Sequence, residues 1–233
     1  DVCSSDLSHS NQFDVFALDL RYLCFVKLTG YHKQVMNGSA FREALSEESD
    51  YLLTDEIFNM IVGHSDPISF KRGDAIIDIG ETDPDIYIIK EGVVRGYMLQ
   101  DGTENNISFG LSGTFVTSMH CFSRNEPSIL RIEACSRVTV LRMKKEVFDS
   151  LVEQHARFAM WVAGVFSRRN YYAELKAHIM SGDALWRYKW LKNCRPELLK
   201  NVPKKAIASY LGMSEIHLSR ITKSINFEEK STK

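Results

Sequence analysis

The sequence lacks any run of 18 or more uncharged apolar residues, and it therefore predicts no membrane-spanning helix. Its most apolar early stretch, residues 13–28, is interrupted by four charged side chains and has no basic signal-peptide segment before it. With 233 residues, 44% of them apolar, the chain can bury a sizeable core, which excludes collagen-like, disordered and small disulfide-scaffold proteins. We expect a cytoplasmic protein with no membrane partner.

Paired metal-ligand motifs are also missing. The five cysteines include no Cys-x-x-Cys pair, so we expect free thiols in a reducing cytosol rather than a zinc ribbon or an iron–sulfur cluster. The histidines include no His-x-His pair, and only His120 lies in the β-rich region, which argues against a cupin-like metal enzyme. The sequence predicts no metal, no cofactor and no catalytic residue. The cysteines are Cys3, Cys24, Cys121, Cys135 and Cys194.

Net charge is nearly absent, because 29 Lys and Arg face 30 Asp and Glu, for a sum of −1. This sum excludes a uniformly basic nucleic-acid coat protein or a polybasic membrane binder. The charge is unevenly distributed, however. Residues 184–233 hold 11 Lys or Arg against 4 Glu, a net charge of +7, so residues 1–183 carry −8. An acidic body followed by a basic tail gives the first indication of function.

The first two thirds of the chain change periodicity twice. Residues 1–50 show no motif, and we expect a poorly defined N-terminal extension there. Thr54, followed by two acidic residues, is typical of a helix N-cap. Over residues 67–142 the apolar period becomes two, and Asp101-Gly102 predicts a tight hairpin because a type I′ turn needs positive φ at both central residues. Short strands at this spacing predict an antiparallel β-roll of the jelly-roll kind.

Beyond Lys145 the apolar period is helical. Four apolar residues recur at intervals of seven, which predicts a narrow seam on one long helix over residues 151–181. The seam either forms a dimer, as a two-fold DNA reader requires, or packs the helix on its own domain. The predicted dimerisation residues are Phe158, Val165, Tyr172 and Ile179.

The basic tail contains the most specific motif. Two helical segments flank Gly212, and Ala208 stands four residues before that glycine. A helix-turn-helix needs a small residue where its helices cross, a glycine in the left-handed turn and apolar residues that close the pair. A generic helical hairpin explains the apolar positions but neither this spacing nor the +7 charge. The apolar positions are Ile207, Leu211, Met213, Leu218 and Ile221.

The second helix of this pair begins with Ser214 as N-cap, which leaves its outer face free to enter a DNA groove. Arg220 suits a bidentate contact with guanine, worth about 1–3 kcal/mol of discrimination. Glu215 either reads cytosine or is an acid favoured at a helix N-terminus. Hydroxyl and lysine side chains suit phosphate or secondary contacts. The predicted DNA-binding residues are Lys204, Lys205, Ser214, Glu215, Ile216, His217, Ser219, Arg220 and Lys223.

The order of β-roll, long helix and helix-turn-helix resembles the Crp/Fnr superfamily of bacterial transcription regulators. Residues 70–74 (FKRGD), residues 89–95 (IKEGVVR) and the Asp-Gly hairpin look like its cyclic-nucleotide-binding-type roll. Residues 207–212 (IASYLG) and 218–221 (LSRI) look like its DNA-binding end.

This resemblance implies an α+β fold: an extension over 1–50, a sensory β-roll over 51–150, a dimerisation helix over 151–181 and a helix-turn-helix domain over 182–233. It implies a non-enzymatic, sequence-specific transcription regulator in which an effector signal passes from the roll through the dimer helix to the DNA reader. Its partners would be double-stranded DNA, a second copy of the chain, RNA polymerase and an unidentified small-molecule effector. The alternative is a cyclic-nucleotide-binding module or a structural partner with a degenerate DNA-binding domain.

The sequence departs from the family in its phosphate-binding cassette. Cyclic-AMP-responsive members have an acid and later an arginine where this chain has Thr114 and Ser128. Without these groups the anchor for the cyclic phosphate is missing, so we expect no cyclic AMP binding. Another effector would meet the small polar residues of this segment, although loop hydrogen bonds explain them equally. These candidate effector-binding residues are Gly113, Thr114, Thr117, Ser118 and Ser128.

Overall fold

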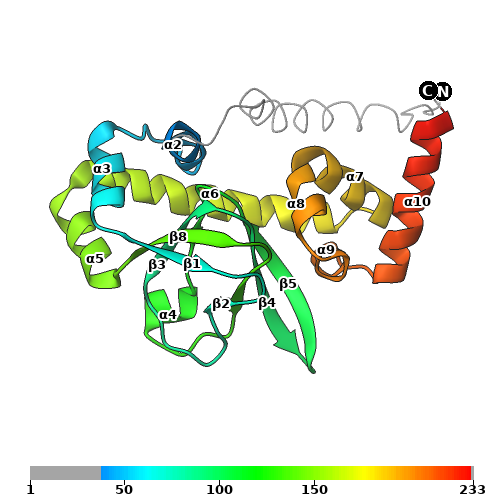
Figure 1. The fold of residues 1–233 in the computed structure, drawn as a ribbon, viewed down its shortest axis with the longest axis horizontal. Coiled ribbons are helices and arrows are strands. Elements are labelled where there is room, and N and C mark those ends of the chain that lie inside the picture. Colours follow the sequence, from blue (N-terminus) through cyan, green and yellow to red (C-terminus); the bar gives the residue numbers. More distant parts are fainter. Residues whose placement is uncertain (1–37, 232–233) are drawn as a thin grey trace, which may run out of the picture.

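The computed structural model describes residues 38–231, which form an α+β fold. A β-roll lies at its centre, and the long helix α6 (Ala156–Met180) runs beside the roll along the length of the molecule (Figure 1). Helices α3 (Asp55–Gly63) and α5 (Lys145–Gln154) lie at one end, and α7 to α10 lie at the other. No helix within residues 38–231 is long and apolar enough to cross a membrane.

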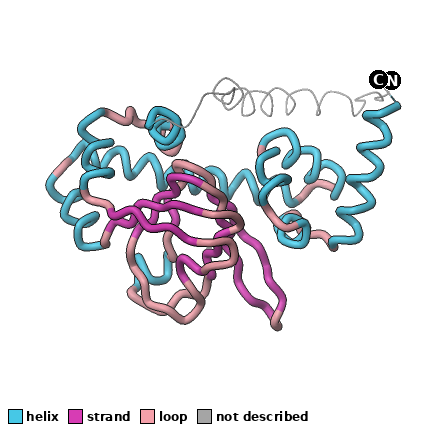
Figure 2. Tube along the Cα trace, in the orientation of Figure 1, coloured by secondary structure: helices cyan, strands magenta, loops and turns pink. Residues whose placement is uncertain are grey.

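Two four-stranded antiparallel sheets form the roll (Figure 2), which confirms the expected fold class. The strand orders are β1-β8-β3-β6 and β2-β7-β4-β5. Apolar side chains from both sheets, among them Ile77, Ile89 and Val140, are buried between them. The strands are β1 (Asp66–Phe70), β2 (Ala75–Ile77), β3 (Ile86–Glu91), β4 (Val94–Gln100), β5 (Thr103–Gly110), β6 (Phe115–Val116), β7 (Arg131–Ala134) and β8 (Val138–Met143).

The hairpin between β4 and β5 has the predicted geometry. Gln100 pairs with Thr103, so the loop consists of two residues. Both of these residues have positive φ, 51° at Asp101 and 73° at Gly102, as a type I′ turn requires. The β4–β5 hairpin projects from the body of the roll (Figure 1), and β5 packs against α9.

No sequence motif predicts the helix α2 (Gly38–Ser46), which falls within the expected extension. Phe41 and Leu45, one turn apart, are buried in the core that α3, α5 and α6 share with the roll. Gly113 makes this close packing possible, because its φ is 89° and a Cβ there would lie 2.5 Å from the Ala44 carbonyl oxygen. Residues 38–50 are therefore part of the folded body, and residues 1–37 lie outside the described residues.

The N-cap predicted at Thr54 is confirmed. Its side-chain oxygen accepts a hydrogen bond from the backbone N–H of Ile57 at 3.2 Å, which satisfies one of the free donors at the start of α3. The short helix α4 (Met119–Arg124) follows β6 within the roll, with Ser118 at its N-cap position.

Helix α6 uses the predicted seam differently from the dimer interpretation. Phe158, Val165 and Ile179 are 0–2% exposed within a single chain, so these three side chains cannot face a second copy. Phe158 and Val165 belong to the core shared with the roll, whereas Tyr172 is 36% exposed. A seven-residue apolar repeat predicts that one stripe of a helix is buried, but it does not say what buries it. In this protein the stripe is buried by other parts of the same chain.

Four helices form the C-terminal end: α7 (Ala184–Cys194), α8 (Pro196–Asn201), α9 (Lys204–Tyr210) and α10 (Glu215–Ser231). Asp183 caps α7 by accepting a hydrogen bond from the Trp186 N–H at 2.8 Å. The apolar cluster of these helices includes Leu191, Leu198, Ile207 and Leu218, and it continues into Val93 and Cys135 of the roll. One hydrophobic core thus joins the C-terminal helices to the β-roll.

Three of the five cysteines lie in the described residues, and each is a free thiol. Burial raises the pKa of Cys135 to about 11, and Cys121 is buried as well. Within residues 38–231 no group of three or more His, Cys, Asp or Glu side chains is arranged to hold a metal ion. Cys3 and Cys24 lie outside the described residues.

Candidate DNA-binding surface and effector cavity

Helices α9 and α10 are joined by the tight turn that contains Gly212. Its φ is 62°, and a Cβ at this position would lie 2.6 Å from Cε of Met180. Ala208 and Leu218 are 1–2% exposed where the helices pack together. The Ser214 hydroxyl accepts a hydrogen bond from the His217 N–H at 3.2 Å, as a helix N-cap does. Only glycine fits this turn without strain, so the pair has the steric pattern expected from the sequence.

The predicted DNA-facing side chains lie on the outside of this helix pair. Ile216 is 68% exposed, whereas Leu218, two residues further along the same helix, is buried. Ser219 differs, because it is partly buried and its hydroxyl donates to the Glu215 carbonyl oxygen at 2.9 Å. The exposed members of the predicted set are Lys204, Lys205, Ser214, Glu215, Ile216, His217, Arg220 and Lys223.

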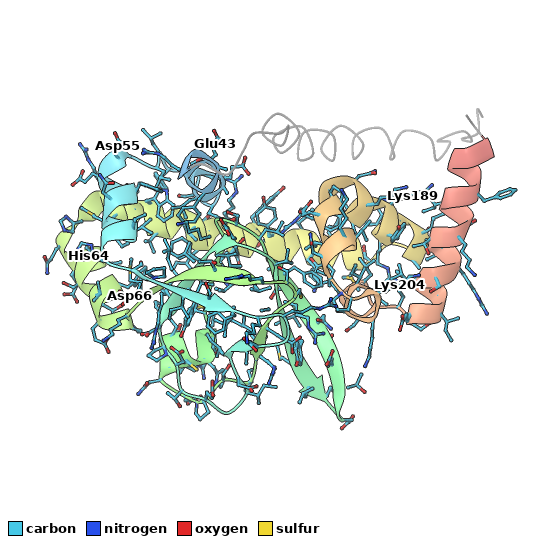
Figure 3. All side chains as sticks on the ribbon, viewed as in Figure 1. Glu43, Asp55, His64, Asp66, Lys189 and Lys204 are labelled. Carbon is cyan, nitrogen blue, oxygen red and sulfur yellow. The ribbon has the colours of Figure 1, made fainter. Side chains whose placement is uncertain are left out.

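The charge separation in the sequence is also a separation in space. Figure 3 places Lys189 and Lys204 at the end formed by α7 to α10, and Glu43, Asp55 and Asp66 in the other half of the molecule. The +7 tail therefore gives one end of the molecule a positive surface.

Helix α9 is fastened to the edge strand β5. Ser209 and Tyr210, at the end of α9, supply the contacts: a hydroxyl bonded to the β5 backbone, and a ring whose centroid is 4.9 Å from that of Phe109. The ammonium of Lys176 in α6 donates to the Ile107 carbonyl oxygen at 2.7 Å and lies 4.0 Å from the centre of the Tyr210 ring. Burial lowers the pKa of Lys176 to about 8. Three elements, α6, β5 and α9, meet at this lysine.

A cavity of about 920 Å³ lies between the β4–β5 face of the roll, α6 and the helices α7 to α9. Its walls are largely apolar, with side chains such as Leu130, Ile132, Leu175 and Trp190. It borders both the roll and the C-terminal helices, and a molecule bound in it would touch both.

Only part of the predicted effector set lines this cavity. Thr114 and Thr117 do, although the Thr117 hydroxyl already donates to the Asp85 carbonyl oxygen at 3.0 Å. Ser118 and Ser128 are buried elsewhere, with their hydroxyl oxygens 2.8 Å apart. Their hydrogen bonds are those of an ordinary loop, which is the second of the two explanations that the sequence left open. Gly113 likewise lies outside the wall and packs against α2.

Arg169 and Lys176, which were not among the residues predicted from the sequence, line the cavity from α6. They are seven residues apart and therefore lie on one face of the helix. Two cations at that interval, on a face otherwise packed against the roll, were the signal that could have identified them.

Residues 67–155 match the cyclic nucleotide-binding domain family. Among solved structures, FixK2 from Bradyrhizobium japonicum is similar with a TM-score of 0.61 and 18% identity, over 71% of this chain and 86% of that one. The c-di-GMP-responsive global regulator CLP of Xanthomonas campestris is similar with a TM-score of 0.62 and 16% identity, over 76% of this chain and 93% of that one. A protein of Ruegeria pomeroyi described as a putative cyclic nucleotide binding protein is similar with a TM-score of 0.56 and 19% identity, over 82% of this chain and 88% of that one. No curated protein sequence matches this chain significantly.

Proposed function

Because residues 67–155 form a cyclic nucleotide-binding domain with a Crp/Fnr-like β-roll, we propose that this chain is a sequence-specific DNA-binding transcription regulator. In this proposal the α9–α10 pair is a helix-turn-helix, the roll receives an effector signal, and the two communicate through α6 and the β5–α9 contact. RNA polymerase is the expected further partner at the regulated site.

The observation that carries the proposal is the two-sided character of α10. Leu218 and Ile221 are buried against the core, whereas Ile216 and Arg220 on the other side are exposed. A helix with a buried stripe and an outer face bearing an arginine and an apolar side chain suits the major groove, where guanine and the thymine methyl group are read. The positive surface around it supplies phosphate contacts.

A two-fold DNA reader needs a second copy of the chain, and the outer face of α6 supports one. Met160, Ala163, Ser167 and Tyr171 follow one another at intervals of three and four, and all four are exposed. This exposed stripe lies on the side of α6 opposite Val165 and takes over the dimerisation role first expected for the buried seam.

The alternative, a cyclic-nucleotide-binding module without DNA binding, rests on the family match and the cavity. The departures at Thr114 and Ser128 count against cyclic AMP as its ligand, since neither can neutralise a cyclic phosphate. Isothermal calorimetry with cyclic AMP decides this point: we expect no binding at micromolar concentrations. Micromolar binding would favour the alternative.

A gel shift with DNA from upstream of the protein's own gene tests the regulator proposal. At low salt we expect a shifted band that disappears when unlabelled DNA of the same sequence is added as competitor. Unlabelled random DNA should not remove this band. Arg220→Ala should weaken specific binding by about 1–3 kcal/mol per half-site, while binding to random DNA changes little. Arg124→Ala, an exposed arginine of α4 in the roll, is the matched control. No specific shift, or an equal shift for Arg220→Ala, contradicts the proposal.

A further inference from the structure

Arg169 is the one cation of the cavity wall that is partly buried and has no partner within residues 38–231. No hydrogen bond or ion pair shorter than 4 Å reaches its guanidinium there. The neighbouring carboxylate of Glu48 acts on it only over a longer distance, and burial lowers the pKa of Arg169 despite that carboxylate. A guanidinium placed in this way has lost part of its hydration without a direct pairing to an anion within residues 38–231.

The other cations of the wall are accounted for. Lys176 is bonded to the Ile107 carbonyl oxygen, and Arg195 pairs with Glu197 at 3.2 Å. Lys200 is exposed to solvent. Among the cations of this wall, Arg169 is therefore the partly buried one with unused hydrogen-bonding capacity. It carries five N–H donors in a planar fork that matches a carboxylate or phosphate.

We propose that Arg169 anchors an anionic ligand and that the cavity takes a small organic anion with an apolar body. This inference rests on the proposed function, because it names the chemical class of the effector. The anion pairs with the guanidinium of α6, and the apolar body lies along Leu130, Ile132 and Leu175. The long helix supplies this anchor, whereas the effector contacts expected from the sequence were small polar residues between Gly113 and Ser128.

The position of Arg169 also connects the ligand to the DNA reader. Arg169 lies two helical turns before Lys176 on the same face of α6, and Lys176 contacts both β5 and Tyr210 of α9. A molecule held at Arg169 can reach along the wall toward this contact, since Arg169, Lys176 and Tyr210 all line the same cavity. Binding thereby changes the surroundings of the α9 docking contact directly.

The test uses two fluorescent probes with the same apolar body, one with an anionic group and one without. 8-Anilinonaphthalene-1-sulfonate carries a sulfonate, and N-phenyl-1-naphthylamine is neutral. We expect wild type to bind one sulfonate probe per chain, and Arg169→Gln to weaken that binding at least about tenfold. Binding of the neutral probe should change less than about twofold. Arg168→Gln is the matched control, because Arg168 pairs with Asp50 at 2.8 Å and is not part of the wall.

Competition in wild type removes any dependence on how the variant folds. Octanoate or octyl phosphate should displace the sulfonate probe, and octanol at the same concentration should not. The two anions distinguish a carboxylate ligand from a phosphate ligand. Equal probe affinity in wild type and Arg169→Gln, equal losses for both probes, or displacement by octanol overturns the proposal.

The same preparations are tested in the DNA gel shift, so that the two proposals fail separately. If the protein binds specific DNA but Arg169→Gln does not change its affinity for the sulfonate probe, the proposal of a transcription regulator stands and the proposal of an anion anchor at Arg169 is refuted. If binding of the sulfonate probe depends on Arg169 but no specific DNA binding is found, the proposal of a transcription regulator is refuted and the proposal of an anion anchor stands.

Discussion

The hydroxyl of Ser209 in α9 accepts a hydrogen bond from the backbone N–H of Asn106 in β5 at 3.0 Å. The same hydroxyl donates to the Glu104 carbonyl oxygen at 3.0 Å. Strand β5 is the last strand of its sheet, so its outer backbone groups have no strand to pair with. The C-terminal helices supply the missing partners, and the docking of α9 thereby satisfies the edge of the roll.

Ser209→Ala should lower the free energy of unfolding by about 1–2 kcal/mol, because it leaves the buried Asn106 N–H without an acceptor. Urea denaturation measures this change, and hydrogen exchange should show faster exchange at the Asn106 amide. Ser224→Ala, an exposed serine of α10, is the control and should be neutral. If both variants unfold at the same urea concentration, the contact does not hold α9 on the roll.

Because of Lys176, we expect the free energy of unfolding to depend on pH in the alkaline range. Its folded-state pKa of about 8 is below the usual lysine value near 10.4, so between about pH 8 and 10 the unfolded chain binds a proton that the folded chain does not. Stability contributed by this site therefore rises with pH across that window. Lys176→Met lacks the titrating group.

Urea unfolding of both proteins at several pH values from 7 to 10 checks this. The wild type should gain stability relative to Lys176→Met as the pH rises, and taking the difference cancels the titration of groups such as Cys135. Lys200→Met, at an exposed lysine, should show no such trend. A wild-type-to-variant difference that is constant with pH argues against a perturbed lysine.

Lys204, at the start of α9, should contact DNA phosphate and not bases. Lys204→Ala is expected to weaken binding to specific and random DNA alike, and to reduce the slope of log K against log salt by about 0.9. Fluorescence anisotropy between 50 and 200 mM salt measures the slope. Lys90→Ala, an exposed lysine of the roll, should leave the slope unchanged. A larger loss on specific DNA alone would make Lys204 a base-reading residue.

Two neighbouring residues of α6 separate dimer formation from folding. Ala163→Asp places a charge on the exposed stripe and should yield folded monomers. Val165→Asp buries an unpaired carboxylate in a side chain position that is 2% exposed and should unfold the protein. Light scattering and circular dichroism distinguish these results. Dimers that persist in Ala163→Asp would place the two-fold contact on another surface.

The parts of the fold that local chemistry determines were predictable from the sequence. Asp101-Gly102 specifies its turn by backbone conformation alone, and Thr54 specifies a helix start by its hydroxyl. The Ala208 to Gly212 spacing likewise reflects a contact between adjacent segments. Each of these signals lies within a few residues of the structure it produces.

Features that depend on distant partners were not predictable. The stripe of Phe158 and Val165 marks burial, but the sequence does not say whether a sheet of the same chain or a second copy provides the cover. The bond between Ser118 and Ser128 occupies groups that looked available for a ligand. Arg169 is a candidate because its guanidinium has no hydrogen-bond or ion-pair partner among residues 38–231, and no local sequence pattern reports that.

The apolar cluster that joins Leu198 and Ile207 to Val93 and Cys135 sets a limit on modularity. A C-terminal segment cut at residue 182 would leave that face of its helices open to water, and the roll would lose the cover over its edge strand. Exchange of the C-terminal helices between similar proteins would therefore succeed only when the recipient roll has a matching apolar face. Substitutions on the two sides of this contact are thus expected to occur together.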